Sequence, residues 1–168
     1  MERLICIAIG YICGLFQTAY FYGRLNNIDI RDHGSGNSGT TNALRTLGKK
    51  AGIITLSGDL LKSMLAVWIV RLIFGESHPG SIVLLSMYAG VGAVIGHNYP
   101  FYLKFKGGKG IAATGGLIIA INPWMGLIAA ICFVSVIALT KYVSVGSLLV
   151  TVVFWVQVIV YGRRGGFG

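Results

Sequence analysis

Charged residues are scarce in this sequence, and acidic ones are the scarcest. They make up 11% of the chain, with 5 Asp and Glu against 14 Lys and Arg, which gives a formal net charge of +9. In a soluble protein this excess would suggest nucleic acid as a partner, but 55% of the residues are hydrophobic and the mean hydropathy is +0.76. Because the basic residues fall between long apolar segments, we expect no nucleic-acid partner and instead a membrane protein that meets anionic headgroups or substrates.

Cysteine is also rare, and its pattern offers neither a disulfide framework nor a metal site. Cys6, Cys13 and Cys132 each lie within an apolar segment. They lack the spacing of metal ligands, so we interpret them as packed free thiols. Since the sequence contains no metal-ligand cluster, we expect no metal and no cofactor.

The apolar segments predict an all-α fold. The first is about long enough to span the hydrocarbon core as a helix, and a signal peptide is disfavoured because no small-residue cleavage site follows it. A later run is interrupted at Asn122-Pro123, where proline should separate two helices. We predict one integral membrane domain over residues 1–168, a polytopic helix bundle with six apolar helical segments at residues 4–23, 51–74, 81–99, 111–121, 124–140 and 143–161.

The basic residues predict how this bundle is oriented. The loops over residues 24–50 and 100–110 hold most of the Lys and Arg. By the positive-inside rule both loops are cytoplasmic and the N-terminus lies outside. The same count leaves Arg163 and Arg164 outside, against the rule, and one more helix would return the chain to the cytoplasm. We therefore expect Gly168 to be a truncation point.

The first loop contains a glycine-rich polar stretch, residues 34–45. Its glycines allow the backbone to approach a ligand closely, and its hydroxyls, amides and guanidinium are donors that suit a phosphate. The glycines match G-x-G-x-x-G, but a dinucleotide motif needs a preceding strand, and an apolar segment precedes this one. The alternative is a flexible loop between helices. The candidate site residues in or beside this stretch are Gly34, Ser35, Gly36, Asn37, Gly39, Thr41, Asn42, Arg45 and Lys49.

The second loop alternates lysines with small residues just before the apolar segment 111–121. Backbone N–H groups at a helix start and mobile ammonium groups can together bind phosphate, although the spacing is not that of a Walker A loop. A contact with lipid headgroups is the alternative. Two such loops on one predicted face favour a phosphate-handling site. The candidates here are His97, Lys104, Lys106, Gly107, Gly108, Lys109 and Gly110.

Two charged residues lie deep within the second apolar segment. Asp59 and Lys62 are three residues apart, so they share a helix face and can form an ion pair. Because a bare charge at this depth is costly, their face should look into the bundle or a wet cavity. We interpret them as a buried pair that fixes helix packing, with a direct substrate role as the alternative.

The two loops resemble the first two motifs of the bacterial acyl-phosphate:glycerol-3-phosphate acyltransferases, the PlsY family. The resemblance lies in G-S-G-N-S-G-T-T-N-A-L-R at residues 34–45 and in Gly96-His97 followed by K-F-K-G-G-K-G at residues 104–110. Residues 59–62 and 141–144 also resemble family positions. The resemblance implies seven helices in the bacterial inner membrane, with the motif loops cytoplasmic. The family's third motif, a C-terminal stretch with His, Asn, Arg and Glu after one further helix, is not found here.

The resemblance also implies an activity. Members of this family move a fatty acyl group from acyl phosphate to the sn-1 hydroxyl of glycerol 3-phosphate, giving lysophosphatidic acid and phosphate, the first step of bacterial phospholipid synthesis, without using acyl-CoA directly. The implied partners are these two substrates and membrane lipid. The candidate catalytic residues are Ser35, Arg45, His97 and Lys104, and Ser144 is a further candidate for binding substrate.

Three points stay open at the level of sequence. Ser35 would act either as a hydrogen-bond donor or as a nucleophile with His97 as its base, and the family resemblance suggests that the phosphate of the acyl donor can itself serve as base. A small phosphate or anion transporter is one alternative function, although the glycines lie in loops and not at the midplane. A non-catalytic membrane protein that binds anionic lipid is the other.

Overall fold

The computed structural model describes residues 1–163 and is all-helical over that range, which confirms the predicted fold class. Five helical segments are long and apolar enough to cross a membrane, and α6 is a shorter apolar helix. The position predicted for Arg164 lies outside the described residues. The helices are α1 Glu2–Gly14, α2 Thr18–Leu25, α3 Thr40–Leu47, α4 Lys49–Phe74, α5 Ile82–Asn98, α6 Ile111–Ile121, α7 Pro123–Thr140 and α8 Val143–Arg163, with 3-10 turns at Ile30–Asp32, Pro79–Ser81 and Phe101–Leu103.

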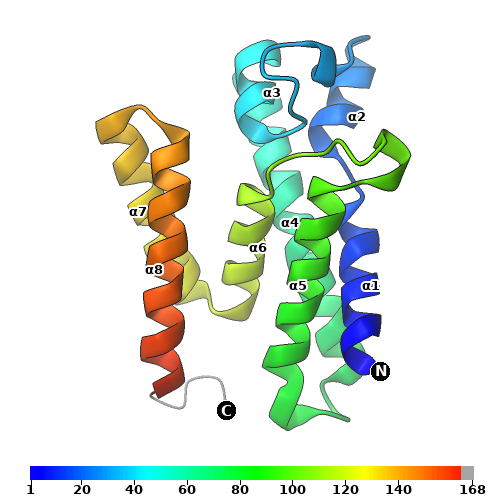
Figure 1. Cartoon of the computed structure of the whole chain (residues 1–168), viewed down its shortest axis with the longest axis vertical. Coiled ribbons are helices and arrows are strands. Elements are labelled where there is room, and N and C mark those ends of the chain that lie inside the picture. The colour runs from blue at the N-terminus through cyan, green and yellow to red at the C-terminus, as the bar shows by residue number, and fades with distance from the viewer. Residues whose placement is uncertain (164–168) are drawn as a thin grey trace.

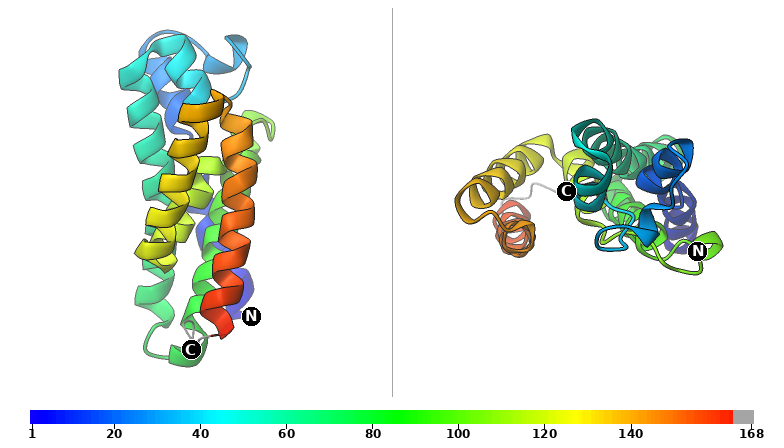
Figure 2. Two further views of the ribbon diagram at one scale, coloured as in Figure 1. Left: turned by 90° about the vertical axis from the view of Figure 1, so that its left-hand side faces the viewer. Right: turned by 90° about the horizontal axis from the view of Figure 1, so that it is seen from above.

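Helices α1 to α6 pack together, and α7 and α8 form a hairpin that joins them through α6 (Figures 1 and 2). Small residues bring α1 and α5 into close contact, as is common between membrane helices. A Cβ at Gly10 would meet the carbonyl oxygen of Ala89, and a Cβ at Gly92 would meet that of Ile7. Any larger residue at these two positions would therefore push α1 and α5 apart.

The predicted helix over residues 4–23 is not continuous. Helix α1 ends at Gly14 and α2 begins at Thr18, with Gln17 at φ −97° and ψ 86° between them. The break frees backbone carbonyls, and side chains from elsewhere satisfy them, since the Lys62 Nζ atom donates to the Phe16 carbonyl at 2.8 Å. The apolar composition of this segment gave no sign of the interruption.

The predicted loop over residues 24–50 is also more ordered than expected. It contains the 3-10 turn at Ile30–Asp32 and the helix α3, and α4 begins at Lys49 directly after it. Gly48, with a left-handed φ of 85°, turns the chain between α3 and α4. The polar motif is thus carried partly on a short helix that packs on α4 and not only on a loop.

The break predicted at Asn122-Pro123 is present. Helix α6 has the predicted range, and Pro123 starts α7, where its missing N–H costs nothing. The Asn122 side-chain oxygen caps α7 by accepting from the backbone N–H groups of Trp124 at 3.0 Å and Met125 at 3.2 Å. This cap fixes the sharp turn that joins the hairpin to the rest of the bundle.

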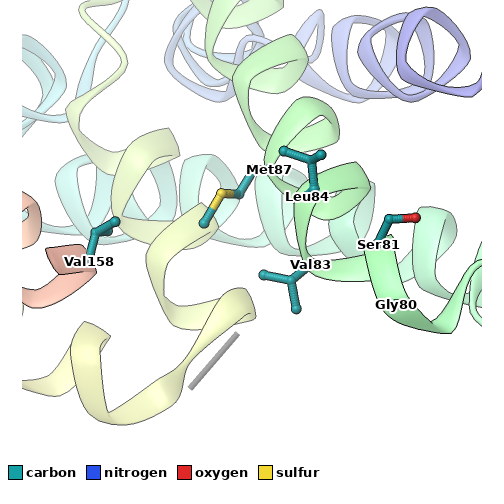
Figure 3. A pocket seen from close by; sticks show the side chains of 6 residues that line it. All are labelled: Gly80, Ser81, Val83, Leu84, Met87 and Val158. Atoms are coloured by element: carbon teal, nitrogen blue, oxygen red, sulfur yellow. The ribbon is translucent and has the colours of Figure 1, made fainter. Parts of the chain in front are cut away.

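Both polar loops lie at the same end of the bundle, and the N-terminus lies at the opposite end (Figure 1). The turn between α7 and α8 shares the end with the loops, and α8 finishes near the other end. A pocket of about 260 Å³ between α5 and α8 also lies toward that far end and offers no charged group (Figure 3). Its lining residues are Gly80, Ser81, Val83, Leu84, Met87 and Val158.

Candidate active site

Within the predicted loop over residues 24–50, residues 33–39 form the segment before α3 that is called the first loop from here on. The buried side-chain amide of Asn42 on α3 holds this segment in shape. Its side-chain nitrogen donates to the carbonyls of Ile30 at 3.1 Å and His33 at 3.0 Å, and its side-chain oxygen accepts from the backbone N–H of Ser35 at 2.9 Å. A Cβ at Gly34, where φ is 60°, would collide with that oxygen. The Asn42 side chain therefore forms its hydrogen bonds with the protein backbone, and it holds Ser35 in place.

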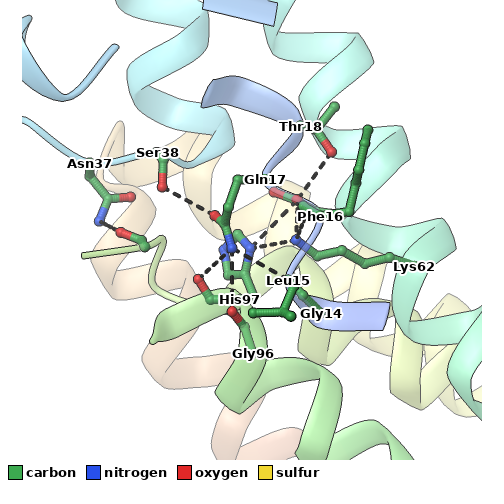
Figure 4. A network of polar contacts seen from close by, with 12 residues as sticks. Gly14, Leu15, Phe16, Gln17, Thr18, Asn37, Ser38, Lys62, Gly96 and His97 are labelled. Atoms are coloured by element: carbon green, nitrogen blue, oxygen red, sulfur yellow. Dashed lines mark hydrogen bonds and ion pairs between the residues drawn. The ribbon is translucent and has the colours of Figure 1, made fainter. Parts of the chain in front are cut away.

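The structure brings the two predicted motifs together. The Asn37 side-chain nitrogen donates to the Gly107 carbonyl at 3.3 Å, which joins the first loop to the second loop, residues 104–110 (Figure 4). The second loop is held in turn on the end of α5, because Gly107 N–H donates to the Asn98 carbonyl at 3.1 Å and Gly108 N–H donates to the His97 carbonyl at 3.0 Å. Residues about 70 apart in sequence thus form one surface.

The second loop, α3 and the start of α4 carry cations that have no protein partner among the described residues. Arg45 on α3 is exposed, as are the second-loop lysines Lys104, Lys106 and Lys109, and Lys49 at the start of α4. Within residues 1–163 none of these five side chains makes a hydrogen bond or an ion pair. The hydroxyl-bearing residues Ser35 and Thr41 are exposed beside them in the sequence. Cations and hydroxyls without protein partners suit a ligand with phosphate charge.

A different arginine at this end is fully committed to the protein. The Arg31 guanidinium donates to Asp29 Oδ2 at 2.7 Å and to Asp29 Oδ1 at 2.9 Å, and it lies 5.0 Å from the centre of the Tyr20 ring. Its hydrogen bonds hold the pKa of the Asp29 carboxyl at about 2, below the usual value of 3.8. A third bond reaches the Leu103 carbonyl at 3.4 Å. Arg31 thus holds the 3-10 turn that precedes the second loop, and its guanidinium is already paired within the protein.

A buried polar centre lies beneath the two loops. Lys62 Nζ lies 2.8 Å from Asp59 Oδ1 and 2.6 Å from His97 Nδ1, and it also donates to the Phe16 carbonyl. None of the three side chains is exposed by more than 5%. The ion pair expected from the spacing of Asp59 and Lys62 is present, and it connects α4 to α5 and to the break between α1 and α2.

His97 is held from within the bundle. One ring nitrogen contacts Lys62, and the other faces the second loop, where a Cβ at Gly108 would meet it. Among the described residues, the Ser35 hydroxyl makes no hydrogen bond with His97. The structure therefore does not bring these two together as nucleophile and base, and it leaves His97 as a support for the second loop.

Ser144 is the predicted site residue that the structure does not unite with the others. It lies in the first turn of α8, on the hairpin that stands apart from the two loops, although at the same end of the bundle (Figure 1). Its backbone carbonyl accepts from the Ser147 hydroxyl at 2.8 Å.

Two residues at the centre of the site were not among the predicted ones. Gln17, buried at the break between α1 and α2, and Ser38, buried in the first loop, are hydrogen-bonded to each other at 3.2 Å. The one available signal was a glutamine inside an apolar segment, because polar side chains at membrane depth are costly and are retained for a reason. Ser38 carried no signal of its own among its polar neighbours.

Comparison with known proteins decides the family. A family model described as "Glycerol-3-phosphate acyltransferase" matches residues 4–167. The chain belongs to the glycerol-3-phosphate acyltransferase family. A glycerol-3-phosphate acyltransferase of Thermoanaerobacter sp. (strain X514) is 43% identical over 155 residues, which are 92% of this chain and 75% of the relative.

Solved structures of a glycerol-3-phosphate acyltransferase share the fold. The crystal structure of PlsY (YgiH), an integral membrane glycerol 3-phosphate acyltransferase, in its glycerol 3-phosphate form has a TM-score of 0.85 and 30% identity, and covers 96% of this chain and 78% of that chain. Its lysophosphatidic acid form has a TM-score of 0.83 at the same identity and the same coverage. The chain is therefore an integral membrane protein of this acyltransferase fold.

Proposed function

We propose that this chain transfers a fatty acyl group from acyl phosphate to the sn-1 hydroxyl of glycerol 3-phosphate, giving lysophosphatidic acid and phosphate. The observation that carries this proposal is the joined pair of loops, where Asn37 bonds to Gly107 and the nearby cations have no protein partner. Family membership supports it, as do the glycerol 3-phosphate and lysophosphatidic acid forms of the similar PlsY structure.

The chemistry explains why such a site needs several cations. The sn-1 oxygen forms a bond to the acyl carbon, the bond from that carbon to the phosphate oxygen breaks, and the phosphate leaves with the electron pair. The hydroxyl proton passes to the leaving phosphate. Both substrates carry phosphate, so we assign Arg45, Lys104 and Lys109 to neutralise their repulsion and to stabilise the charge that develops on the leaving group. Ser35 serves as a hydrogen-bond donor, and holding the two substrates together supplies much of the remaining rate.

The direct test supplies both substrates to the purified protein. Reconstituted in lipid, it should convert acyl phosphate and glycerol 3-phosphate into lysophosphatidic acid with release of one phosphate per product, and acyl-CoA should not replace the acyl donor. A preparation that shows a cooperative thermal unfolding transition, and is therefore folded, but forms no lysophosphatidic acid would contradict the proposal.

We also propose that the protein lies in the bacterial inner membrane with the N-terminus outside and both loops cytoplasmic. The two loops lie at one end of the bundle and the N-terminus lies at the other, which supports placing them on opposite sides of the membrane. The excess of Lys and Arg in the loops supports the cytoplasmic side for the loops. Single cysteines at Lys50 and at Glu76, in a background with the native cysteines replaced, should be labelled from opposite sides of the membrane, with Lys50 reached only from the cytoplasm.

Replacing Gly108 by Ala is expected to weaken binding of glycerol 3-phosphate. The new Cβ would collide with the His97 ring, so the second loop must move off the end of α5. Because we assign this loop to binding, the KM for glycerol 3-phosphate should rise by on the order of 10-fold with a smaller change in kcat. The matched control is Gly80→Ala, since a Cβ at Gly80 meets nothing within 4 Å. A loss confined to kcat would move this loop from binding to chemistry.

A further inference from the structure

The amide of Gln17 lies where the break between α1 and α2, the first loop and the end of α5 meet (Figure 4). Its side chain is fully buried. Its nitrogen donates toward the carbonyls of His97 at 3.0 Å and of Gly14 and Gly96 at 3.4 Å each. Its oxygen accepts from the Ser38 hydroxyl at 3.2 Å.

The surroundings of this amide fix its orientation. Three carbonyl oxygens, which can only accept, surround one end, so that end must be the nitrogen. The other end faces a hydroxyl, which can donate to the amide oxygen. An apolar side chain of similar shape would leave the buried Ser38 hydroxyl without its partner and would remove one of the two donors to the His97 carbonyl, and a buried polar group without a partner is costly.

Each end of the amide leads directly to one motif loop. Ser38 follows Asn37, which bonds to Gly107, and it precedes Gly39, the N-cap of α3. On the other side, the His97 carbonyl that accepts from Gln17 also accepts from the Gly108 N–H. A single buried side chain therefore ties the first loop and the start of α3 to the seat of the second loop.

We propose that Gln17 is a positioning residue for acyl transfer, which acts through Ser38 and His97 to hold the first loop and α3 in register with the second loop. This inference rests on the proposed function, because it assigns the two loops to one phosphate site. Gln17 itself touches no substrate. Its effect arises because a displacement of about 1 Å between groups that bind two substrates can lower the rate by on the order of 10²-fold.

The test compares Gln17→Met with a matched control, Gln157→Met. Methionine keeps the unbranched shape of glutamine and removes its hydrogen bonds. Gln157 is the other buried glutamine of the described residues, and it donates to the Met125 carbonyl at 3.3 Å within the α7–α8 hairpin, away from the loops. We expect Gln17→Met to lower kcat/KM for acyl phosphate and glycerol 3-phosphate by on the order of 10²-fold, and Gln157→Met to lower it by less than about 2-fold.

A second variant guards against misfolding of the first. Ser38→Ala breaks the same hydrogen bond from the other side, so we expect a comparable loss in kcat/KM. The kcat/KM of the double variant should be no lower than that of the less active single variant, because both changes break one connection. Losses that multiply in the double variant would overturn the proposal, as would wild-type kcat/KM in Gln17→Met. If the loss in Gln17→Met came only from removing a buried amide, Gln157→Met should lose as much kcat/KM, and that result would also overturn the proposal.

Amide hydrogen exchange separates this proposal from the proposed function. In Gln17→Met, peptides covering residues 34–39 and 104–110 should both exchange faster, and in Gln157→Met neither should change. If the wild-type protein formed no lysophosphatidic acid, the proposed function would fail while the exchange result still decided whether Gln17 holds the loops together. Unchanged exchange in Gln17→Met would overturn the positioning role regardless of turnover.

Discussion

Replacing Arg45 by Ala is expected to lower kcat/KM for acyl transfer by on the order of 10²–10³-fold while leaving the bundle folded. Arg45 lies on α3, and its exposed side chain makes no hydrogen bond or ion pair with any other residue in the range 1–163. Truncating its side chain therefore breaks no hydrogen bond or ion pair among the described residues. Steady-state kinetics with both substrates, together with thermal unfolding in the same lipid, measure the two parts of this prediction.

The conservative replacement distinguishes a bidentate contact from simple charge. Arg45→Lys keeps the positive charge but loses the planar fork that can bind two phosphate oxygens at once, so we expect it to recover little of the activity. Lys50→Ala is the matched control, because it removes one exposed cation from the same end of the bundle. If Arg45→Lys equalled the wild type, or if Lys50→Ala lost as much as Arg45→Ala, the assigned role of Arg45 would be wrong.

The features that could be predicted from the sequence are those with a local cause. Apolar length predicts the membrane helices, and Asn122-Pro123 predicts the end of α6 because proline cannot continue a helix and asparagine caps the next one. The spacing of Asp59 and Lys62 predicts their ion pair because residues three apart share a helix face. Each of these inferences needs only neighbouring residues.

The features that were missed have distant causes. The break after Gly14 is stabilised by residues far along the chain: Lys62 donates to Phe16, 46 residues away, and carbonyls of α5 accept from Gln17, about 80 residues away. Gln17 itself is the one local sign of the break. Helix α3 was missed because its Thr and Asn residues are typical of turns, whereas Ala43 on its inner face packs in a small core with Ala19, Ile30 and Ala51. Ser38 and Asn37 could not be told apart until partners were visible, one inside the bundle and one on the second loop.

Replacing Lys62 by Met is expected to destabilise the folded bundle strongly. Lys62 neutralises Asp59 at 2.8 Å in a site where the carboxylate is 1% exposed, so its removal leaves a buried charge without a partner. Breaking a buried pair in this way costs about 3–5 kcal/mol in free energy of unfolding. The Phe16 carbonyl, freed by the helix break, loses its donor as well. Thermal unfolding should therefore show a large fall in the midpoint for Lys62→Met.

Combination with a second change tests whether this loss comes from the unpaired carboxylate. Asp59→Asn in the Lys62→Met background removes the unpaired charge and keeps a side-chain oxygen near Thr18, whose hydroxyl donates to Asp59 at 3.5 Å. We expect the double variant to be more stable than Lys62→Met alone, since the two positions are directly coupled. Arg71→Met is the matched control, because Arg71 lies at the far end of the same helix and its side chain takes part in no ion pair within residues 1–163. Additive losses in the double variant would show that Lys62 stabilises the bundle by some means other than this pair, and the role assigned here to the buried centre beneath the loops would fail.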